Sequence, residues 1–183
     1  QVDARARETG LPVVYVNRIG GQDELVFDGA SFIVDATGAL AQQVPAWHET
    51  VALARFDGPV PRHVRGDLDP ALEPHVYDAL VMGVRDYVGK NGFKGVVLGL
   101  SGGIDSAVVA VLAADAFGPD NIIGVSLPSA ISSQHSKDDA RILADNLGIR
   151  FETIAIANTV ASAETALGPV FAGRKPDVTE ENI

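Results

Sequence analysis

The 183-residue sequence has no cysteine, and it has few basic residues, with 14 lysines and arginines against 24 aspartates and glutamates. Without cysteine the chain can form neither a disulfide nor a thiolate zinc site, and it supplies no thiol nucleophile. The net charge of −10 argues against the broad basic face that nucleic-acid binding requires. No apolar run reaches the roughly 18 residues of a membrane helix, and the first residues lack a signal-peptide pattern. We expect a cytoplasmic globular protein without nucleic-acid or membrane partners, in which phosphate binding is local.

The first 56 residues are predicted to form a helix followed by strands. Residues 1–10 (QVDARARETG) have the pattern of the last turns of a helix that Gly10 ends. Apolar runs separated by turn residues then continue to residue 56, which is typical of an antiparallel or mixed sheet. Residues 57–74 are rich in proline, glycine and aspartate and are predicted to be a linker.

Beyond the linker the sequence alternates between helical and strand patterns. The predicted helices cover residues 73–92, 107–118 and 136–148, the last beginning at Ser136. The predicted strands are GVVLGL (95–100), expected to be buried on both faces, NIIGVSLP (121–128) and RFETIAI (150–156). Such alternation indicates a parallel sheet with right-handed crossovers. Residues 158–176 are weakly patterned and TEENI (179–183) begins another helix, so both ends of the chain look truncated.

The segment SGGIDS, residues 101–106, directly follows the first of these strands. In an open α/β sheet the turn from the first strand to the first helix is a favoured phosphate site. Gly102 and Gly103 can take positive φ and bring N–H groups close to a phosphate, and the next helix adds its positive amino end. The two serine hydroxyls can donate to phosphate, whereas Asp105 would repel it unless a cation stands between them. We infer Mg²⁺ at Asp105.

Other interpretations of this segment remain open. It could be only a tight strand-to-helix turn in which Asp105 and Ser106 favour the helix start. A Walker-type loop is disfavoured because no lysine directly precedes a serine or threonine, and a Rossmann fingerprint fails on its glycine spacing.

SGGIDS after an apolar strand resembles the signature of the ATP-pyrophosphatases, which cleave ATP between the α and β phosphates and include NAD, GMP and asparagine synthetases. Residues 79–118 and 124–149, with the later TEENI, resemble the synthetase domain of glutamine-dependent NAD synthetases. Residues 11–38 resemble the carboxyl-terminal part of a nitrilase-type glutamine amidohydrolase. A nitrilase tail joined to an SGGIDS domain is specific to the glutamine-dependent NAD synthetase family.

The resemblance implies an α/β fold with a parallel-sheet, adenine nucleotide alpha hydrolase-like domain, preceded by the carboxyl-terminal β part of a nitrilase-like α/β sandwich. Residues 1–56 would belong to the amidohydrolase domain, 57–74 to the linker and 75–183 to the synthetase domain. The family's glutaminase cysteine is absent here, so no catalytic residue is assigned. The chain is interpreted as an internal fragment of a longer enzyme, and an active and an inactive fragment both remain open.

The implied activity is a two-step ligation in NAD biosynthesis. Deamido-NAD attacks the α phosphate of ATP, and ammonia from glutamine then displaces AMP to give NAD. The implied cofactors are ATP and Mg²⁺, with Asp105 as the metal ligand, and a homo-oligomer is expected. The nucleotide contacts would come from Gly99, Leu100, Ser101, Gly102, Gly103, Ile104, Asp105, Ser106, Ser132, Ser133 and Gln134. The alternatives are another ATP-pyrophosphatase amidotransferase, such as GMP synthetase, or a catalytically inactive nucleotide-binding fragment.

Several other polar residues are interpreted as structural. His48, His63 and His75 lack metal-ligand spacing and are expected on the surface or in the linker. Residues 23–24 (Asp-Glu) are expected in a surface turn, because adjacent strand positions face opposite ways. Trp47 is expected to serve packing.

Overall fold

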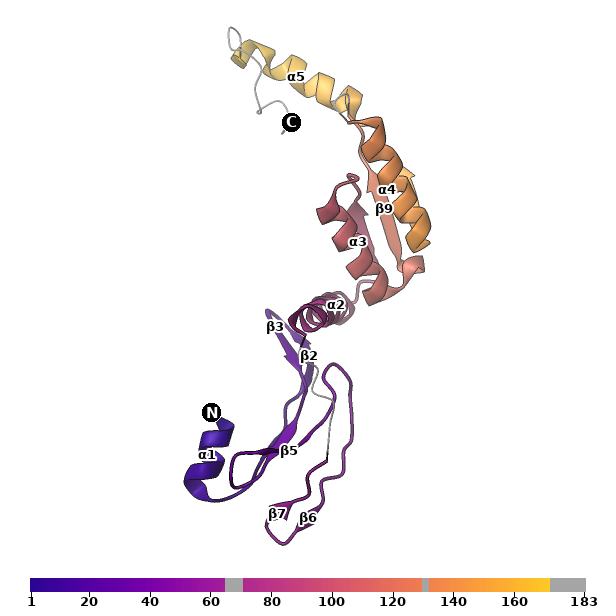
Figure 1. The fold of residues 1–183 in the computed structure, drawn as a ribbon. Helices are drawn as coiled ribbons and strands as arrows, with labels where there is room; N and C mark the ends of the chain where they lie inside the picture. Colours follow the sequence, from indigo (N-terminus) through magenta and orange to yellow (C-terminus); the bar gives the residue numbers. More distant parts are fainter. Residues whose placement is uncertain (65–70, 130–131, 172–183) are drawn as a thin grey trace. The chain divides into compact units, whose positions relative to one another are not determined.

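A computed structural model describes residues 1–64, 71–129 and 132–171 (Figure 1). The chain divides into two compact units, Gln1–Phe93 and Lys94–Ile183. Within the described residues, no helix combines the length and the apolar character needed to cross a membrane.

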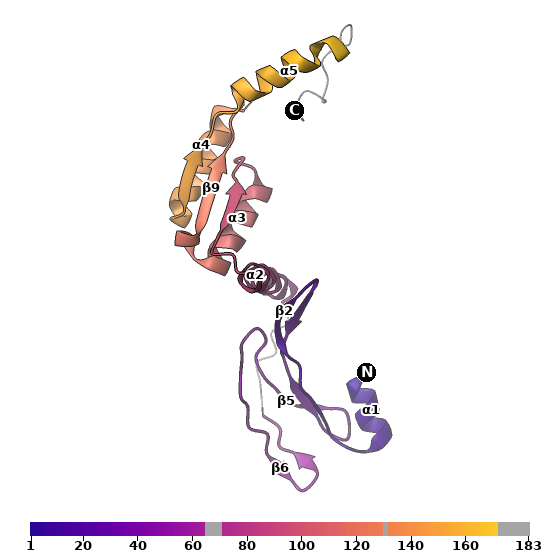
Figure 2. The same ribbon diagram turned by 180° about the vertical axis from the view of Figure 1, so that it is seen from behind.

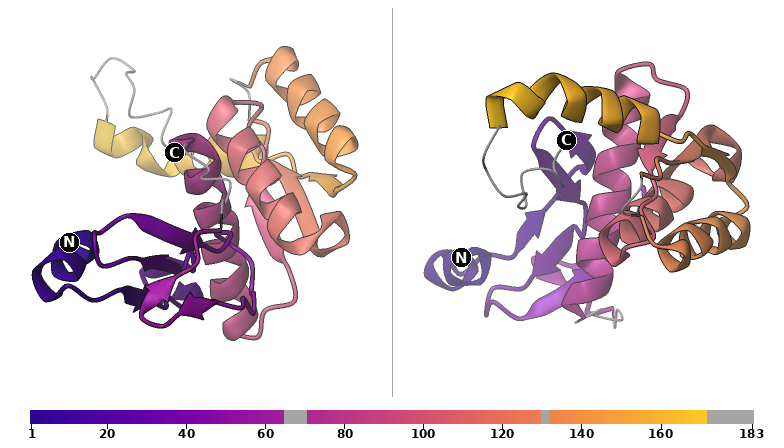
Figure 3. Two further views of the ribbon diagram at one scale, coloured as in Figure 1. Left: turned by 60° about the horizontal axis from the view of Figure 1, so that its bottom comes forward. Right: turned by 90° about the horizontal axis from the view of Figure 1, so that it is seen from above.

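The amino-terminal unit is built mainly from antiparallel strands, as the sequence predicts. Its first helix, α1 (Val2–Thr9), ends where Gly10 adopts a left-handed φ of 65°, and α1 packs beside β1 and β4 (Figure 3). A three-stranded antiparallel sheet has the order β1 (Val13–Tyr15), β4 (Phe32–Val34) and β5 (Leu40–Gln43). Two hairpins complete the strands: β2 (Ile19–Gln22) with β3 (Leu25–Asp28), and β6 (Phe56–Asp57) with β7 (Val60–Pro61). The segment predicted as a linker therefore contains β7, which the sequence pattern missed.

The hairpin β2–β3 packs on the long helix α2 (Leu72–Lys90), as Figure 2 shows. The Asp86 carboxylate accepts a hydrogen bond of 2.8 Å from the Gly21 amide, and the Lys90 ammonium donates to the Gly21 carbonyl oxygen. The α2 residue that faces Gly21 is also a glycine, Gly83. A Cβ on Gly21 would lie 3.4 Å from the Gly83 Cα. Glycines at both positions let the hairpin backbone approach α2 closely, and Asp86 and Lys90 then satisfy its polar groups.

We expect Asp86→Ala to lower the free energy of opening this hairpin away from α2 by about 1.5 kcal/mol, because the Gly21 amide loses a charged acceptor. Amide hydrogen exchange over residues 19–28 should become roughly tenfold faster. Asp78→Ala is the matched control, since Asp78 lies exposed on the same helix. Equal exchange in the two variants would show that the Asp86 contact does not hold the hairpin.

The carboxyl-terminal unit contains the predicted parallel sheet. Its three described strands have the order β10 (Arg150–Thr153), β9 (Ile122–Ser126) and β8 (Val96–Gly99), and both pairings are parallel. The crossover helices α3 (Ile104–Phe117) and α4 (Gln134–Leu147) contact each other and β9, so both cover the same face of the sheet. The core between them is formed by small and branched side chains: Leu100, Ala110, Ala113, Ile122, Ala140, Ala144 and Ile149.

The prediction that the strand of residues 95–100 is buried on both faces is wrong for the described residues. Leu98 packs against the core, whereas Val97, on the opposite face, is 69% exposed. Successive strand residues face opposite ways, and α3 and α4 cover one of these two faces. A continuous apolar run does not reveal which face is covered.

All three predicted helices have shifted boundaries: α2 runs from Leu72 to Lys90, and α3 begins at Ile104, three residues before the predicted start. The helix predicted to begin at Ser136 begins two residues earlier, at Gln134, because the Ser133 hydroxyl caps it by accepting a hydrogen bond of 3.1 Å from the Ser136 amide. The weakly patterned region forms α5 (Ala157–Phe171), which has Pro169 near its end. The predicted helix of residues 179–183 lies outside the described residues.

Candidate functional site

The predicted site begins where β8 ends. Leu100 is buried, and its amide donates a hydrogen bond of 2.8 Å to the carbonyl oxygen of Val125 on β9. The next residues, from Ser101, leave the sheet at the edge where the parallel strands have their carboxyl ends. Because ligands of open α/β sheets bind at this edge, the fold places the loop where the sequence predicts it.

Position 102 requires glycine for two reasons, the packing around it and its backbone conformation. Its φ is 84°, and a Cβ at this position would lie 2.7 Å from the Ser136 Cα and closer still to the Ser136 carbonyl oxygen. No other residue fits this position without movement of α4. The loop therefore rests on the first turn of α4.

Gly103 differs from the prediction that both glycines take positive φ. Its φ is −90° with ψ 160°, the extended conformation of a residue that precedes a helix, and it is the N-cap of α3. A Cβ here would lie 3.3 Å from the Ser101 Oγ. Gly103 thus serves the helix start and the tight turn, whereas Gly102 supplies the left-handed conformation.

The two loop serines bind each other and the backbone of the turn. Their Oγ atoms are 3.1 Å apart, and the Ser101 Oγ accepts a hydrogen bond of 3.2 Å from the Gly103 amide. The Ser106 hydroxyl donates to the Gly103 carbonyl oxygen at 2.9 Å. Because a hydroxyl has one proton, the Ser106 proton is used within the turn, and Ser101 then supplies the proton between the two Oγ atoms. In this arrangement the serines shape the loop, and the donors left for a ligand are backbone amides other than those of Ser101 and Gly103, which donate to the two hydroxyls.

The amino ends of α3 and α4 differ in how they are capped. The α4 helix is capped by Ser133, whereas α3 has no side-chain cap among the described residues. The first-turn amides of a helix have no acceptor within the helix, so the start of α3 presents N–H donors and a partial positive charge. Asp105 lies in this turn and is exposed. The arrangement suits an anion that approaches the loop from outside.

A hollow of about 570 Å³ opens beside this loop. It is lined from three directions: the end of β8, the segment after β9 and the first turn of α4. Of the predicted nucleotide residues, the hollow is lined by Gly99, Leu100, Ser101, Ser132 and Ser133. The predicted residues outside the lining are Gly102, Gly103, Ile104, Asp105, Ser106 and Gln134.

Sequence reasoning missed several residues that line the hollow: Val125, Ser126, Leu127, Pro128, Ser129, Ser136 and Lys137. The end of a predicted strand was the available signal for the first five. Ser126 is buried at 7% exposure, and its carbonyl oxygen accepts a hydrogen bond of 2.9 Å from the Ile154 amide. Lys137 lies within the predicted helix of residues 136–148, and the helical pattern alone gave no reason to assign it to the site.

Asp105 offers one exposed carboxylate that a metal ion could bind. Within residues 1–64, 71–129 and 132–171, no group of three or more histidine, cysteine, aspartate or glutamate side chains could hold a metal. Magnesium is commonly held by one or two carboxylates together with substrate phosphates and water, so one exposed carboxylate suffices when a nucleotide supplies the other oxygens.

Trp47, His63 and His75 of the amino-terminal unit form polar contacts. The Trp47 indole donates to His75 Nδ1 at 2.9 Å, so Trp47 has a polar role in addition to the predicted packing. The exposed His63 lies 3.1 Å from the Asp35 carboxylate. Hydrogen bonds, led by that of the Thr37 hydroxyl, lower the pKa of Asp35 to about 2. These contacts hold turns, and the predicted surface turn at residues 23–24 is confirmed as the turn of β2–β3.

Comparison with known proteins also divides the sequence into two parts, with the junction before α2 instead of after it. Residues 76–183 match the family described as NAD synthase, and residues 1–63 match the family described as carbon-nitrogen hydrolase. The glutamine-dependent NAD(+) synthetase of Rhodobacter capsulatus is 50% identical over 184 residues, which cover 98% of this chain and 33% of that protein. The chain thus spans about a third of the length of the curated relatives it matches.

Solved structures give the same result. The glutamine-dependent NAD+ synthetase of Acinetobacter baumannii, solved in complex with adenosine diphosphate, matches 98% of this chain and 35% of its own at 40% identity and a TM-score of 0.92. The NH3-dependent NAD synthetase of Campylobacter jejuni matches 60% of this chain and 45% of its own at 28% identity and a TM-score of 0.52. The predicted α/β fold, a parallel synthetase sheet preceded by carbon-nitrogen hydrolase strands, is confirmed.

Proposed function

The chain belongs to the NAD synthase family, and on that premise we propose that its carboxyl-terminal unit binds ATP for the amidation of deamido-NAD to NAD. The observation that carries the proposal is the uncapped start of α3, which follows the Gly102 turn at the carboxyl edge of a parallel sheet and beside a hollow. The adenosine diphosphate bound to the Acinetobacter relative supports an adenine nucleotide as the ligand.

The proposed reaction has two steps. A carboxylate oxygen of deamido-NAD attacks the α phosphorus of ATP, the bond to the bridging oxygen breaks, and pyrophosphate leaves. Ammonia then attacks the acyl carbon, AMP leaves with the bonding electrons, and the nitrogen loses a proton. No covalent bond to the protein is needed.

This chain's contribution would be to hold and polarise the phosphates. Backbone amides at the start of α3 are fixed before the ligand arrives, so they can stabilise the charge that grows on the leaving pyrophosphate without reorganising. Mg²⁺ bound at Asp105 would neutralise part of that charge. The nucleotide contacts we propose are those of the hollow and the loop: Gly99, Leu100, Ser101, Gly102, Gly103, Ile104, Asp105, Ser106, Ser132, Ser133 and Gln134.

The domain boundaries also remain a proposal. We place the end of the amidohydrolase part at residue 56 and the start of the synthetase part at residue 75, with 57–74 between them. The two family matches, which end at residue 63 and begin at residue 76, support a junction in this region. Packing of α2 on β2–β3 nevertheless joins this helix to the amino-terminal unit.

The remaining partners follow from the family. Glutamine or free ammonia would supply the nitrogen, and the full enzyme would be a cytoplasmic homo-oligomer. The chain itself holds no cysteine for glutamine hydrolysis.

We expect ATP with Mg²⁺ to slow amide exchange about tenfold or more across residues 101–106 of the 183-residue chain, because the phosphates would occupy these donors. Hydrogen exchange followed by mass spectrometry measures this. Residues 19–28 of the other unit serve as an internal control and should not change. If saturating ATP leaves residues 101–106 unchanged, this loop is not the phosphate site.

A chimeric enzyme tests catalysis separately from nucleotide binding. The 183 residues replace the aligned third of the Rhodobacter capsulatus relative, and NAD formation is measured with ammonium as the nitrogen source. Activity supports a synthetase, whereas ATP binding without activity supports the alternative of a nucleotide-binding segment.

A further inference from the structure

Lys137 is a charged residue with no assigned role in the hollow. It lies in the first turns of α4, is half-buried and lines the cavity beside Ser101 and Ser133. Among the described residues that line the hollow it is the only charged one, and the others are serines, a glycine, a proline and aliphatic residues. The cavity is therefore locally cationic in a chain whose net charge is −10.

The position is electrostatically unfavourable for a lysine in the absence of an anion. The amino end of a helix carries a partial positive charge, so acids are favoured there and cations are not. The two acids next in sequence are engaged elsewhere on α4: Asp138 accepts a hydrogen bond of 2.8 Å from the Gln134 side-chain Nε2, and Asp139 lies 3.6 Å from His135 Nδ1. Within the described part of the chain, no ion pair involves Lys137.

The same residue lies next to the phosphate loop. The Gly102 backbone packs against Ser136, the residue before Lys137. The hollow is thus bordered by the amino end of α4 and by Lys137, and the amino end of α3 follows directly from its Ser101 wall. A ligand matching this arrangement carries several negative charges on one group.

Resting on the proposed function, we propose that Lys137 binds the β and γ phosphates of the nucleoside triphosphate and so distinguishes a triphosphate from a monophosphate. An ammonium group interacts with phosphate as a compact point charge, so it gains energy as the number of charged oxygens near it rises. Lys137 would also hold these phosphates when they leave as pyrophosphate.

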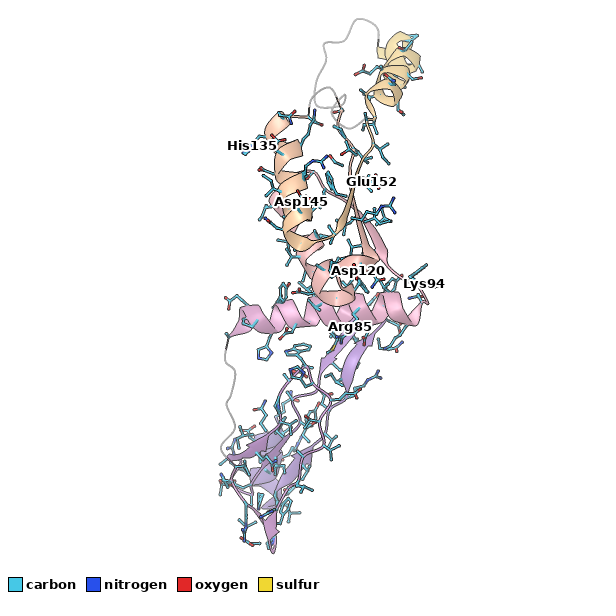
Figure 4. All side chains as sticks on the ribbon, turned by 90° about the vertical axis from the view of Figure 1, so that its right-hand side faces the viewer. Arg85, Lys94, Asp120, His135, Asp145 and Glu152 are labelled. Carbon is cyan, nitrogen blue, oxygen red and sulfur yellow. The ribbon has the colours of Figure 1, made fainter. Side chains whose placement is uncertain are left out.

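The structure offers a matched control. Figure 4 shows Lys94 and Asp120 at one end of the parallel sheet and His135, two residues before Lys137, at the other. Lys94 is exposed and precedes β8, so it lies at the opposite edge of the sheet from the hollow. Replacing Lys94 removes the same charge without touching the cavity.

The test measures binding of ATP, AMP and inorganic pyrophosphate to the 183-residue chain by calorimetry, at constant Mg²⁺. Lys137→Met should weaken ATP and pyrophosphate about 30-fold, because a charged hydrogen bond is lost, and should change AMP by less than threefold. Lys137→Arg should restore most of the affinity, and Lys94→Met should match the unaltered chain. Lys137→Gln, which keeps a polar end, provides the same comparison if the methionine variant unfolds.

Two results would overturn the assignment of Lys137. One is ATP affinity that is unchanged in both Lys137→Met and Lys137→Gln, and the other is an equal loss for ATP and AMP. A different result would overturn the proposed nucleotide function and keep the anion site: the unaltered chain binds pyrophosphate through Lys137 but binds ATP no more tightly than pyrophosphate. If the chain binds none of the three ligands, both proposals are wrong.

Discussion

Replacing Asp105 with asparagine is expected to reduce ammonium-supported NAD formation by the chimera about a thousandfold, because removing a metal ligand costs several kcal/mol of transition-state stabilisation. Asparagine keeps the size of the side chain and the helix start, so a loss reports the missing charge. Coupled detection of NAD and pyrophosphate at saturating Mg²⁺ measures one product of each step.

The control for this variant is Asp120→Asn, which removes one carboxylate at the opposite edge of the same sheet. Glutamine hydrolysis by the chimera is a second control and should persist in both variants, because these 183 residues hold no cysteine and so cannot supply a glutaminase thiol. Normal NAD formation by Asp105→Asn would exclude Asp105 as a metal ligand.

Gly102→Ala is expected to destabilise the carboxyl-terminal unit by about 3 kcal/mol and to abolish ATP binding. The new Cβ would add the strain of a left-handed φ, about 1–2 kcal/mol, to overlap with the Ser136 backbone. Relief of that overlap requires the loop and the start of α4 to separate, which would open the hollow. Exchange of the core amides of Ala110 and Ala140 measures the stability of this unit, whereas the fluorescence of the only tryptophan, Trp47, would report on the other unit.

Gly148→Ala separates the two causes. Gly148 also has a positive φ, of 68°, but a Cβ there would meet no atom within 4 Å. This variant should lose only about 1 kcal/mol and keep its affinity for ATP. If Gly102→Ala behaves in the same way, then close packing of the loop on α4 is not needed for the site.

Much of this architecture is predictable because its signals are local. Gly10 ends a helix, a short apolar run leads into SGGIDS, and both features depend on a few neighbouring residues. The alternation of strands and helices then predicts the parallel sheet, since a helix between two strands is the usual crossover that lets neighbouring strands run parallel.

The features that sequence reasoning missed depend on contacts between distant segments. The exposure of Val97 depends on which face of the sheet the helices cover. The need for glycine at position 102 comes largely from Ser136, which is remote in sequence. The cap at Ser133 instead of Ser136 reflects a choice between two serines that the local pattern does not resolve. Lys137 enters the site for the same reason as Ser136, because α4 begins beside the loop.

The contact between β2–β3 and α2 has a consequence for synthesis on the ribosome. Gly21 and Lys90 are separated by 69 residues, so the hairpin is made well before the helix that covers it. At about 5–20 residues per second, the ribosome needs roughly 3–14 s to add those residues. During this interval the hairpin can pair its two strands but has no helix to pack against. The amino-terminal unit therefore completes its folding only after the first residues that match the NAD synthase family have been translated. A shortened protein that ends before α2 would leave the hairpin uncovered.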